Sequence, residues 1–334
     1  GDAAQRESIS LYLVGGSVRD LLLKRPIRDL DLVTEGDLKQ NALLFAQAIG
    51  AQISQVSQFG TVKLLIGETV IDVASARIER YPFPGSLPEV WPGSIQNDLS
   101  RRDFTINAIA VSLIPGSYGE ILDPFNGIKD LNSSIVRILH SRSFIDDPTR
   151  ILRAIRYECR LGFCMDKQTK AQAINSAQYL DRVSGDRVRS EFERTFDEKD
   201  FESMIDRMVV LGTLIAILPC LKWSPSMHHA FTLLHQSKKI CGPLHIVGLL
   251  SSELTKEEGD SFTDRLNMPS SWRRIVSEMI NLRDCIYSLD TQDIPNSRIY
   301  QILNKLEVPT VECWSVLVES MGIQARLIEF LNRL

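Results

Sequence analysis

The pattern of apolar residues changes near residue 140, and this change is what most constrains the fold. Before it, short strand-like apolar runs alternate with segments whose leucines recur at helical spacing. After it, helical patterns dominate, and we find no strand-like alternation beyond residues 135–139. With 334 residues, 44% of them hydrophobic, the chain is long for a single compact domain. The sequence therefore predicts an N-terminal α/β domain followed by an all-helical region.

Four segments carry the prediction for the N-terminal part. Residues 11–16, LYLVGG, are typical of a strand that ends in a glycine turn, and residues 17–23, SVRDLLL, are typical of the next helix. Residues 61–75 predict a strand pair around the turn GET. Residues 81–93, YPFPGSLPEVWPG, contain four prolines and are expected to form a loop. A short helix should follow, with Ser94 as its N-cap.

Gly15 and Gly16 lie between the predicted first strand and first helix. Glycines at such a turn let backbone N–H groups approach an anion, and the helix N-terminus adds partial positive charge. Many ordinary tight turns also contain two glycines. The pair is therefore compatible with a phosphate site and with a simple turn.

Asp29 and Asp31 belong to the segment DLDLV, in which acidic and aliphatic residues alternate. As a strand, this segment puts both carboxylates on one face, where they repel each other unless a cation lies between them. Mg²⁺ prefers such oxygen ligands, and two ions about 3.5–4 Å apart can activate a hydroxyl and stabilise a leaving pyrophosphate. Asp72, in VIDVAS, is a candidate third ligand. The alternative is that these carboxylates simply face solvent.

Residues 101–108, RRDFTINA, form a second polar cluster. Arginine supplies fork-shaped donors for phosphates, and aspartate accepts hydrogen bonds from sugar hydroxyls. Arg102, Asp103 and Asn107 are thus candidates for binding a nucleoside triphosphate. A solvated helix end would use the same residue types.

Several motifs, in order, resemble those of class II tRNA nucleotidyltransferases, the group that includes bacterial poly(A) polymerases. They cover residues 11 to about 194, and no such signature follows them. The matching segments are LVGGSVRDLLL with RDLDLV, RRDFTINAIA, DPFNGIKDL, FIDDPTRILRAIRY and VSGDRVRSEFE.

The resemblance implies a fold with an α/β head of the polymerase-β type, followed by an all-α neck, body and tail. The expected boundaries are residues 1–139 for the nucleotidyltransferase head, 140–196 for the neck that recognises the base, and 197–334 for the tRNA-binding body and tail. The implied activity is template-independent addition of C and/or A to the 3′ end of tRNA, from CTP and/or ATP, with Mg²⁺ as cofactor.

The same resemblance implies roles for individual residues. Asp29 and Asp31 would be catalytic and would bind Mg²⁺, with Asp72 as a possible further ligand. The residues expected to bind the nucleotide are Gly15, Gly16, Ser17, Arg19, Arg102, Asp103, Asn107, Asp147, Arg150, Arg153 and Arg156.

The neck motif of the family is EDxxRxxRxxR, in which the Asp and the first Arg contact the Watson–Crick edge of the base. Asp147 and Arg150 occupy these positions here, and Asp146 replaces the usual Glu. A carboxylate accepts from an exocyclic amine and a guanidinium donates to a ring nitrogen or carbonyl, so the pair suits C and A, whereas U lacks the amine. A capped helix start with favourable acidic residues would also fit Asp146 and Asp147.

Basic residues are locally in excess between positions 137 and 194, with twelve Lys/Arg against eight Asp/Glu, although the whole chain has a net charge of −4. Such a patch suits phosphate recognition, so Arg160, Arg187 and Arg189 are candidate tRNA contacts. Basic helix faces that are merely solvated are the alternative.

The choice among CCA, CC and A addition stays open. The segment between Arg77 and Asp98 is full length, which argues against a CC-adding enzyme. Its residues 81–93 lack the Asp/Arg pair common in full CCA-adding relatives and resemble the loop of specialised A-adding or CC-adding enzymes. A poly(A) polymerase is a further alternative, although such relatives usually carry extra basic sequence.

A non-catalytic RNA-binding relative is the alternative of a different class; the intact Asp29, Asp31, Asp147 and Arg150 argue against it. A metal-dependent phosphohydrolase is set aside, because none of the five histidines precedes an aspartate. Six cysteines without a CxxC pair predict reduced thiols. We find neither a membrane-spanning run nor signal-peptide character at the N-terminus, so a cytoplasmic setting without membrane partners is expected.

Overall fold

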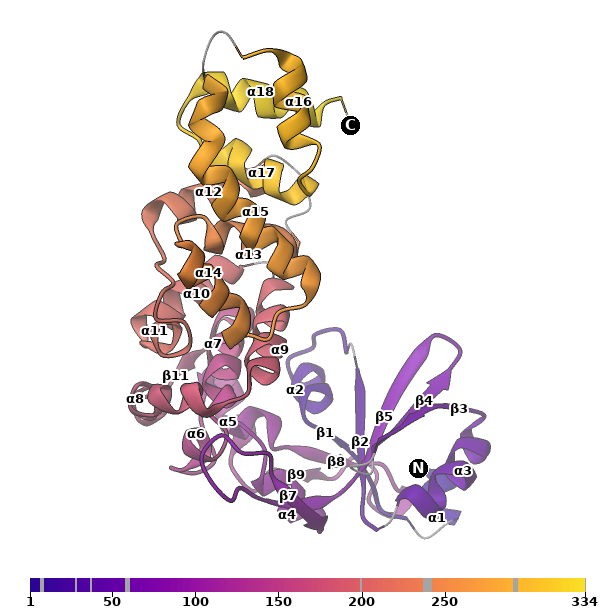
Figure 1. The fold of residues 1–334 in the computed structure, drawn as a ribbon. Coiled ribbons are helices and arrows are strands. Elements are labelled where there is room, and N and C mark those ends of the chain that lie inside the picture. The colour runs from indigo at the N-terminus through magenta and orange to yellow at the C-terminus, as the bar shows by residue number, and fades with distance from the viewer. Residues whose placement is uncertain are drawn as a thin grey trace. The chain divides into compact units, whose positions relative to one another are not determined.

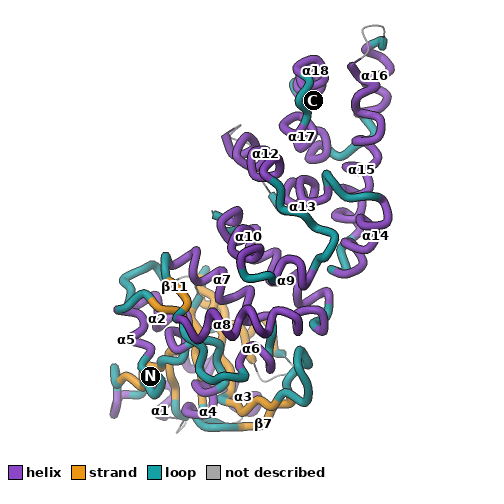
Figure 2. Tube along the Cα trace, turned by 90° about the vertical axis from the view of Figure 1, so that its left-hand side faces the viewer, coloured by secondary structure: helices purple, strands orange, loops and turns teal. Residues whose placement is uncertain are grey.

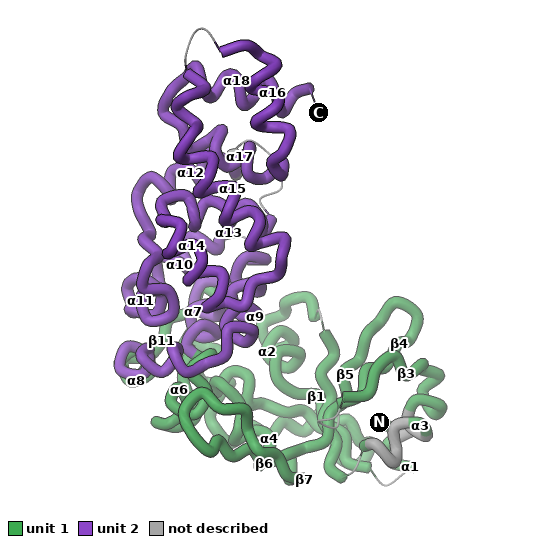
Figure 3. The backbone as a smooth tube through the Cα atoms, in the orientation of Figure 1, with its two compact units in different colours: residues 1–150, 161–173 green, residues 151–160, 174–334 purple. Residues whose placement is uncertain are grey.

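The computed structural model describes residues 1–6, 9–27, 29–36, 38–57, 61–198, 200–236, 242–290 and 294–333. The chain forms two compact units, coloured separately in Figure 3. Unit 1 comprises residues 1–150 and 161–173, and unit 2 comprises residues 151–160 and 174–334. These two units are defined by contacts in space. The predicted division into a head, a neck and a body with tail, with boundaries after residues 139 and 196, concerns function and stays a prediction.

Unit 1 is built on a mixed seven-stranded sheet with the strand order β3-β4-β5-β2-β1-β8-β9 (Figure 1). Strands β2 and β5 run parallel, and the other described neighbours are antiparallel. The strands are β1 Leu11–Val14, β2 Leu30–Thr34, β3 Gln52–Val56, β4 Thr61–Ile66, β5 Thr69–Ser75, β8 Ala110–Ser112 and β9 Ile121–Leu122. The predicted first strand, the strand around Asp31 and the pair around GET are confirmed.

Apolar residues alternate between the two faces of this sheet and form two core clusters. One cluster contains Leu11, Val62 and Val73, and the other contains Val14 and Val33 together with Ile95 and Leu99 of a covering helix. Because side chains alternate along a strand, Asp31 lies on the same face as Val33. The second cluster therefore brings the helix that carries Ile95 to the carboxylate face of the sheet.

The helices of this part also agree with the main predictions. The turn at Gly15 leads into α2, and Ser94 accepts a hydrogen bond from the backbone of Asn97 as the N-cap of α4. The helices that begin in unit 1 are α1 Asp2–Arg6, α2 Gly16–Leu22, α3 Leu38–Ile49, α4 Ile95–Ser100, α5 Gly127–Asn132, α6 Ser143–Asp146, α7 Thr149–Leu161 and α8 Lys167–Ser176.

The prediction of a loop over residues 81–93 is wrong at its end. Residues Glu89–Pro92 form strand β7, which pairs with β6, Arg77–Arg80, in a separate two-stranded sheet. Pro92 cannot donate a ladder hydrogen bond, but a proline is tolerated at the edge of a sheet. The many prolines of this segment predict a loop. They do not reveal that Trp91 lies opposite Ile78 on the neighbouring strand, and this pairing makes the segment a strand.

A second strand also escaped prediction. Residues Cys164–Met165 form β11, which pairs in parallel with β10, Ile135–Val136. Two residues are too few to show the alternation from which strands are predicted. This strand exists because of its partner, which is distant in sequence.

Gly127 allows α5 to pack directly on a short 3₁₀ helix, Thr105–Asn107. A β-carbon at Gly127 would lie 2.2 Å from the carbonyl oxygen of Thr105 and 2.9 Å from the side chain of Ile109. Because backbone cannot move aside cheaply, we expect Gly127→Ala to lower the free energy of unfolding by about 2–3 kcal/mol, measured by urea denaturation. Gly116→Ala, where nothing lies within 4 Å, is the matched control. Equal stability of the two variants would contradict this close packing.

Unit 2 is helical, as predicted (Figure 2). Its buried aromatic residues include Phe201 and Phe231, whose ring centroids are 4.9 Å apart, and Trp272, which packs on Phe196. Its longer helices are α9 Gly185–Phe196, α10 Phe201–Val210, α12 Pro225–Gln236, α13 Pro243–Ser251, α14 Lys256–Arg265, α15 Ser270–Ile286, α16 Asn296–Leu303, α17 Val308–Leu317 and α18 Met321–Leu331. The short α11, Thr213–Ile217, is a further α-helix of this unit.

Two expectations from composition can be compared with the described residues. Within them, no helix is both long and apolar enough to cross a membrane. The described cysteines, Cys159, Cys164, Cys220, Cys285 and Cys313, are free thiols. Cys241 lies outside the described residues.

Candidate active site

Ser17 connects the glycine turn to the aspartate segment. Its hydroxyl donates to the carbonyl oxygen of Asp29 at 2.7 Å and accepts from the backbone N–H of Asp31 at 3.0 Å. The side chain is buried, so these two bonds fix the backbone between the aspartates. The predicted contact of Ser17 with a phosphate stays a prediction, whereas its hydroxyl holds Asp29 and Asp31 in place.

Asp31 and Asp72 are register partners on the parallel strands β2 and β5, so their carboxylates share one face of the sheet. Asp29 is exposed and lies just before β2, two residues ahead of Asp31. The pKa of Asp31 is raised, first by burial and further by the negative charges of Asp72 and Asp29, while Arg102 and Lys63 oppose the rise. The structure thus brings negative charge together at considerable electrostatic cost.

The carboxylate groups provide hard oxygen ligands that suit a divalent cation. Oδ2 of Asp72 forms an ion pair with Nζ of Lys63 at 3.1 Å. The other oxygen, the buried Oδ1, has no hydrogen-bond partner. Such an orphaned oxygen beside a charged carboxylate is what a bound cation would satisfy. Among the described residues, no three His, Cys, Asp or Glu side chains form a ready-made metal cluster. Asp31 and Asp72 therefore fit a cation that also takes ligands from a substrate.

Gly15 lies against both Arg102 and Asp31. Its φ of +66° is a conformation that favours glycine, and a β-carbon there would lie 2.6 Å from Nη1 of Arg102 and 3.9 Å from Oδ2 of Asp31. The turn is therefore kept bare where a guanidinium and a carboxylate approach it. This arrangement leaves the backbone beside a positive charge, as an anionic group requires.

Asp98 is the residue that organises the arginine pair, and the sequence reasoning missed it. It is 0% exposed and accepts from Arg101 through Oδ1 at 2.5 and 2.9 Å, and from Arg102 through Oδ2 at 2.8 and 3.2 Å. Burial alone would raise the pKa of Asp98, but the two guanidiniums outweigh burial and lower the pKa below its usual value. The spacing i, i+3 and i, i+4 from Asp98 to the arginines was a usable signal.

A buried polar chain lies behind the glycine turn. Arg19 donates from Nη1 to the side-chain oxygen of Asn107 at 2.7 Å and from Nε to Asp20 at 2.8 Å. Asn107 in turn donates to Asp103 at 2.9 Å. Less than a tenth of each of these residues is exposed: Arg19, Asp103 and Asn107. Through these buried hydrogen bonds the three side chains orient one another. Their predicted contacts with a nucleotide stay predictions.

Asp147 and Arg150, the proposed base-reading residues, lie at the start of α7. Oδ1 of Asp147 accepts from the backbone N–H of Thr149 at 3.1 Å and from its hydroxyl at 2.6 Å. Arg150 donates to the hydroxyl of Ser143 at 2.8 Å and to the carbonyl oxygen of Arg101 at 2.7 Å. The orientation of the Arg150 guanidinium therefore depends on Ser143, just before α7, and on Arg101, just after α4.

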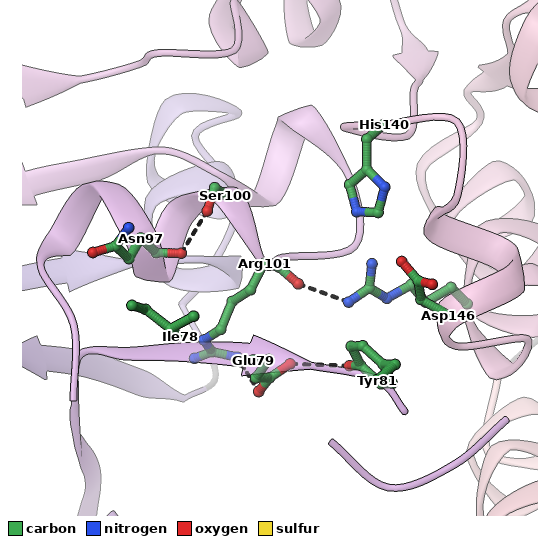
Figure 4. Close-up of a pocket in the computed structure, with 9 residues that line it drawn as sticks. Ile78, Glu79, Tyr81, Asn97, Ser100, Arg101, His140 and Asp146 are labelled. Carbon is green, nitrogen blue, oxygen red and sulfur yellow. Dashed lines mark hydrogen bonds and ion pairs between the residues drawn. The ribbon is translucent and has the colours of Figure 1, made fainter. Parts of the chain in front are cut away.

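A cavity of about 270 Å³ opens beside Arg150 (Figure 4). Burial, together with the positive charge of Arg150, lowers the pKa of His140 in its wall. Residues from three different segments line the cavity: Ile78, Glu79, Tyr81, Asn97, Ser100, Arg101, His140, Asp146 and Arg150.

The other predicted arginines lie in unit 2. Arg156 is almost buried and pairs with Glu191 at 2.6 Å, while Arg153 lies 3.7 Å from the same carboxylate. Arg160 lies 3.6 Å from Glu198. These pairs connect α7 with α9 and the residues that follow it.

Arg187 and Arg189 both lie in α9. Arg189 donates to the carbonyl oxygen of Leu266 at 3.1 Å and pairs with Asp186 at 3.0 Å. The observed contacts of Arg189 are thus internal to unit 2, and binding of an RNA phosphate by either arginine stays a prediction.

Two family models match this chain. Residues 11–137 match the poly(A) polymerase head domain, and residues 162–223 match a probable RNA- and SrmB-binding site of polymerase A. The first match contains Gly15, Asp31, Asp72 and Arg102, which the geometry brings into one region of unit 1.

Curated and solved relatives agree with these matches. An A-adding tRNA nucleotidyltransferase of Halalkalibacterium halodurans is 38% identical over 250 residues, covering 73% of this chain. The chain spans 58% of the length of that relative. An apo CCA-adding enzyme structure has a TM-score of 0.87 at 28% identity, covering 99% of this chain and 81% of that one. A Thermotoga maritima CCA-adding enzyme complexed with tRNA has a TM-score of 0.78 at 28% identity, covering 100% and 80%.

The two family models follow each other along the chain in the order of the motifs, and the solved relatives share the α/β head and the helical remainder. On these grounds the chain belongs to the class II tRNA nucleotidyltransferase family, which includes the bacterial poly(A) polymerases.

Proposed function

We propose that this protein transfers a nucleotidyl group from ATP or CTP to the 3′ end of tRNA. The observation that carries the proposal is the meeting of the Asp31 and Asp72 carboxylates with the bare turn at Gly15 and the guanidinium of Arg102. In this reaction the terminal RNA hydroxyl oxygen forms a bond to the α-phosphorus. The bond from that phosphorus to the pyrophosphate oxygen breaks, and the hydroxyl proton passes to solvent.

Asp29 and Asp31 would hold Mg²⁺, with Asp72 as a further ligand. Bound Mg²⁺ supplies activation of the attacking hydroxyl and stabilisation of the leaving pyrophosphate. The oxygen donor set, the raised pKa of Asp31 and the orphaned Oδ1 of Asp72 support this assignment.

The triphosphate would lie along the turn formed by Gly15, Gly16 and the backbone of Ser17. Arg102, held by Asp98, would donate to its oxygens. Asp103 and Asn107 would contact the sugar, and Arg19 would orient Asn107 through its 2.7 Å hydrogen bond. These residues position the α-phosphorus for the attack.

Asp147 and Arg150 would read the base, as the motif implies, with Arg153 and Arg156 following on the same helix. Residues 140–196 would serve as this neck, and residues 197–334 as a body and tail that bind tRNA. Arg160, Arg187 and Arg189 would contact the phosphates of the tRNA. The protein would act in the cytoplasm.

We expect Arg150→Ala to relax nucleotide choice more than it weakens RNA binding. Losing a two-donor contact to a base should reduce discrimination against UTP and GTP by about tenfold or more. Single-nucleotide incorporation rates for the four triphosphates measure this, with tRNA affinity measured separately. The exposed Arg6→Ala is the control with the same loss of charge. Unchanged discrimination in the Arg150 variant would show that it does not read the base.

The test of the proposal itself is an incorporation assay with Mg²⁺ on three tRNA transcripts that lack CCA, end in C, or end in CC. ATP and CTP are supplied separately and together. We expect ATP incorporation on the CC-ended transcript, because the curated relative described above is an A-adding enzyme. Complete CCA on the first transcript would identify a full CCA-adding enzyme, and long A tails would identify a poly(A) polymerase. No incorporation on any transcript, with RNA binding retained, would favour the non-catalytic RNA-binding alternative.

A further inference from the structure

Glu79 carries a buried carboxylate that belongs neither to the aspartate cluster nor to the phosphate-facing arginines. Its side chain is 5% exposed and lies in the wall of the cavity beside Arg150. Oε1 accepts from Arg77 at 2.6 and 2.9 Å and from Arg101 at 2.9 Å, while Oε2 accepts from the hydroxyl of Tyr81 at 2.9 Å. Both oxygens of this carboxylate are therefore hydrogen-bonded, and a buried charge is balanced by two guanidiniums.

The bonds of Glu79 lead in two directions, and Figure 4 shows Glu79 with two of its partners, Tyr81 and Arg101. Through Arg101 they lead to Asp98, the buried carboxylate that also holds Arg102. Through Tyr81 they lead to Arg150, whose guanidinium carbon lies 5.9 Å from the centre of the Tyr81 ring. The same Arg101 also accepts from Arg150 through its carbonyl oxygen, at 2.7 Å. Glu79 is thus linked to Arg150 by two separate routes.

Tyr81 is suited to transmit this constraint. Burial raises the pKa of its hydroxyl far above the ordinary value, with the positive charge of Arg150 opposing the rise and the Glu79 carboxylate adding to it. The phenol therefore stays protonated and donates to Glu79, and the fixed ring forms a cation–π contact with Arg150. Loss of the Glu79 charge would weaken the hold on the ring and would leave Asp98 as the carboxylate partner of the Arg101 side chain.

We propose that Glu79 is a positioning residue that holds Arg150, through Tyr81 and Arg101, in the orientation that selects bases with an exocyclic amine. The inference rests on the proposed function, because it deepens the role given there to Arg150. It assigns base selectivity partly to the two-stranded sheet of β6 and β7, which lies between the sequence motifs RDLDLV and RRDFTINAIA. Glu79 itself need not touch the nucleotide.

The test compares Glu79→Gln and Tyr81→Phe with Glu89→Gln, an exposed carboxylate on β7 next to Val90, the register partner of Glu79. Equilibrium affinities are measured for ATP, CTP, UTP, GTP and inorganic tripolyphosphate, and incorporation rates are measured on tRNA. We expect the Glu79 and Tyr81 variants to reduce the preference for ATP or CTP over UTP and GTP by about tenfold, the size expected for a lost hydrogen bond to a charged group. Tripolyphosphate affinity should change less than about twofold, since its binding does not involve the base.

If the role is purely structural, the variants should lose affinity for all five ligands alike, or melt at a lower temperature with an unchanged preference among the nucleotides. Either result would overturn the inference. An unchanged preference in both variants would overturn it as well. Tyr81→Phe keeps the ring, so it decides the matter if Glu79→Gln does not fold. If wild-type protein transfers no nucleotide to tRNA but shows a preference in binding that depends on Glu79, the proposed function fails and the inference stands. Absence of any preference in wild-type binding and transfer would overturn the inference.

Discussion

Asp31→Asn should abolish nucleotide incorporation, with a loss of about a thousandfold or more in rate, while the protein remains folded. The carboxylate charge is what would hold Mg²⁺, and asparagine of the same shape cannot replace it. Because the folded state raises the pKa of Asp31, the ionised carboxylate is less favourable in the folded than in the unfolded chain. Removing this charge should leave the melting temperature, measured in EDTA without nucleotide, unchanged or slightly higher. Single-turnover incorporation on CC-ended tRNA measures the activity.

The control for this prediction is Glu68→Gln, which removes an exposed charge at the turn between β4 and β5. It should leave both rate and stability unchanged. Affinity of the Asp31 variant for tRNA should stay within about twofold of wild type, because phosphate contacts elsewhere carry that affinity. Asp29→Asn should behave in the same way as Asp31→Asn. Substantial incorporation by both single variants would refute the metal assignment.

Asp98→Ala should have the largest effect on stability, together with a loss of triphosphate affinity. It leaves Arg101 and Arg102 without their shared carboxylate, and their side chains are only 19% and 16% exposed. Breaking such a pair costs about 3 kcal/mol, at the lower end for buried pairs because the arginines keep some contact with water. ATP affinity should fall about tenfold, since Arg102 is no longer oriented. Urea unfolding and equilibrium ATP titration measure the two effects.

The pH dependence provides a second check on Asp98. Its pKa is lower in the folded state than in the unfolded chain, where it is about 4. Its stabilising contribution is therefore complete above the unfolded pKa and is lost as the pH falls through the folded pKa. The difference in stability between wild type and Asp98→Ala should therefore shrink as the pH is lowered through that range. Asp260→Ala, an exposed aspartate in α14, is the control. A constant difference at all pH values would contradict the role of the charge.

Local features of the fold could be predicted because they depend on neighbouring residues. The alternation in residues 29–33 predicted β2, the turn GET predicted the pair of β4 and β5, and Ser94 predicted the start of α4. The double glycine correctly marked a turn with positive φ at Gly15. Spacing, capping and turn chemistry are all encoded within a few residues, so the sequence alone reveals them.

Features that depend on a distant partner could not be predicted in this way. The four prolines of residues 81–93 predict a loop, and only pairing with β6 makes the last part of this segment strand β7. The contact of Ser17 with a phosphate stays a prediction, and its hydroxyl also bridges Asp29 and Asp31, twelve and fourteen residues away, which no local pattern indicates. As single acidic residues in the sequence, Glu79 and Asp98 carry no local signal of their roles. Both proved to be buried junctions for arginines.

Sequence patterns alone predicted the order of the strands and helices in the segments with clear periodicity, and the motifs indicated the family and the residue types available for chemistry. The tertiary structure alone decided which charged groups meet. The carboxylates of Asp31 and Asp72 share a face only because β2 and β5 lie in register, and Arg150 donates to Arg101, 49 residues away, only because two segments pack together. Periodicity and capping act over a few residues, whereas charge pairing and pKa shifts depend on distance in space and on exclusion of water.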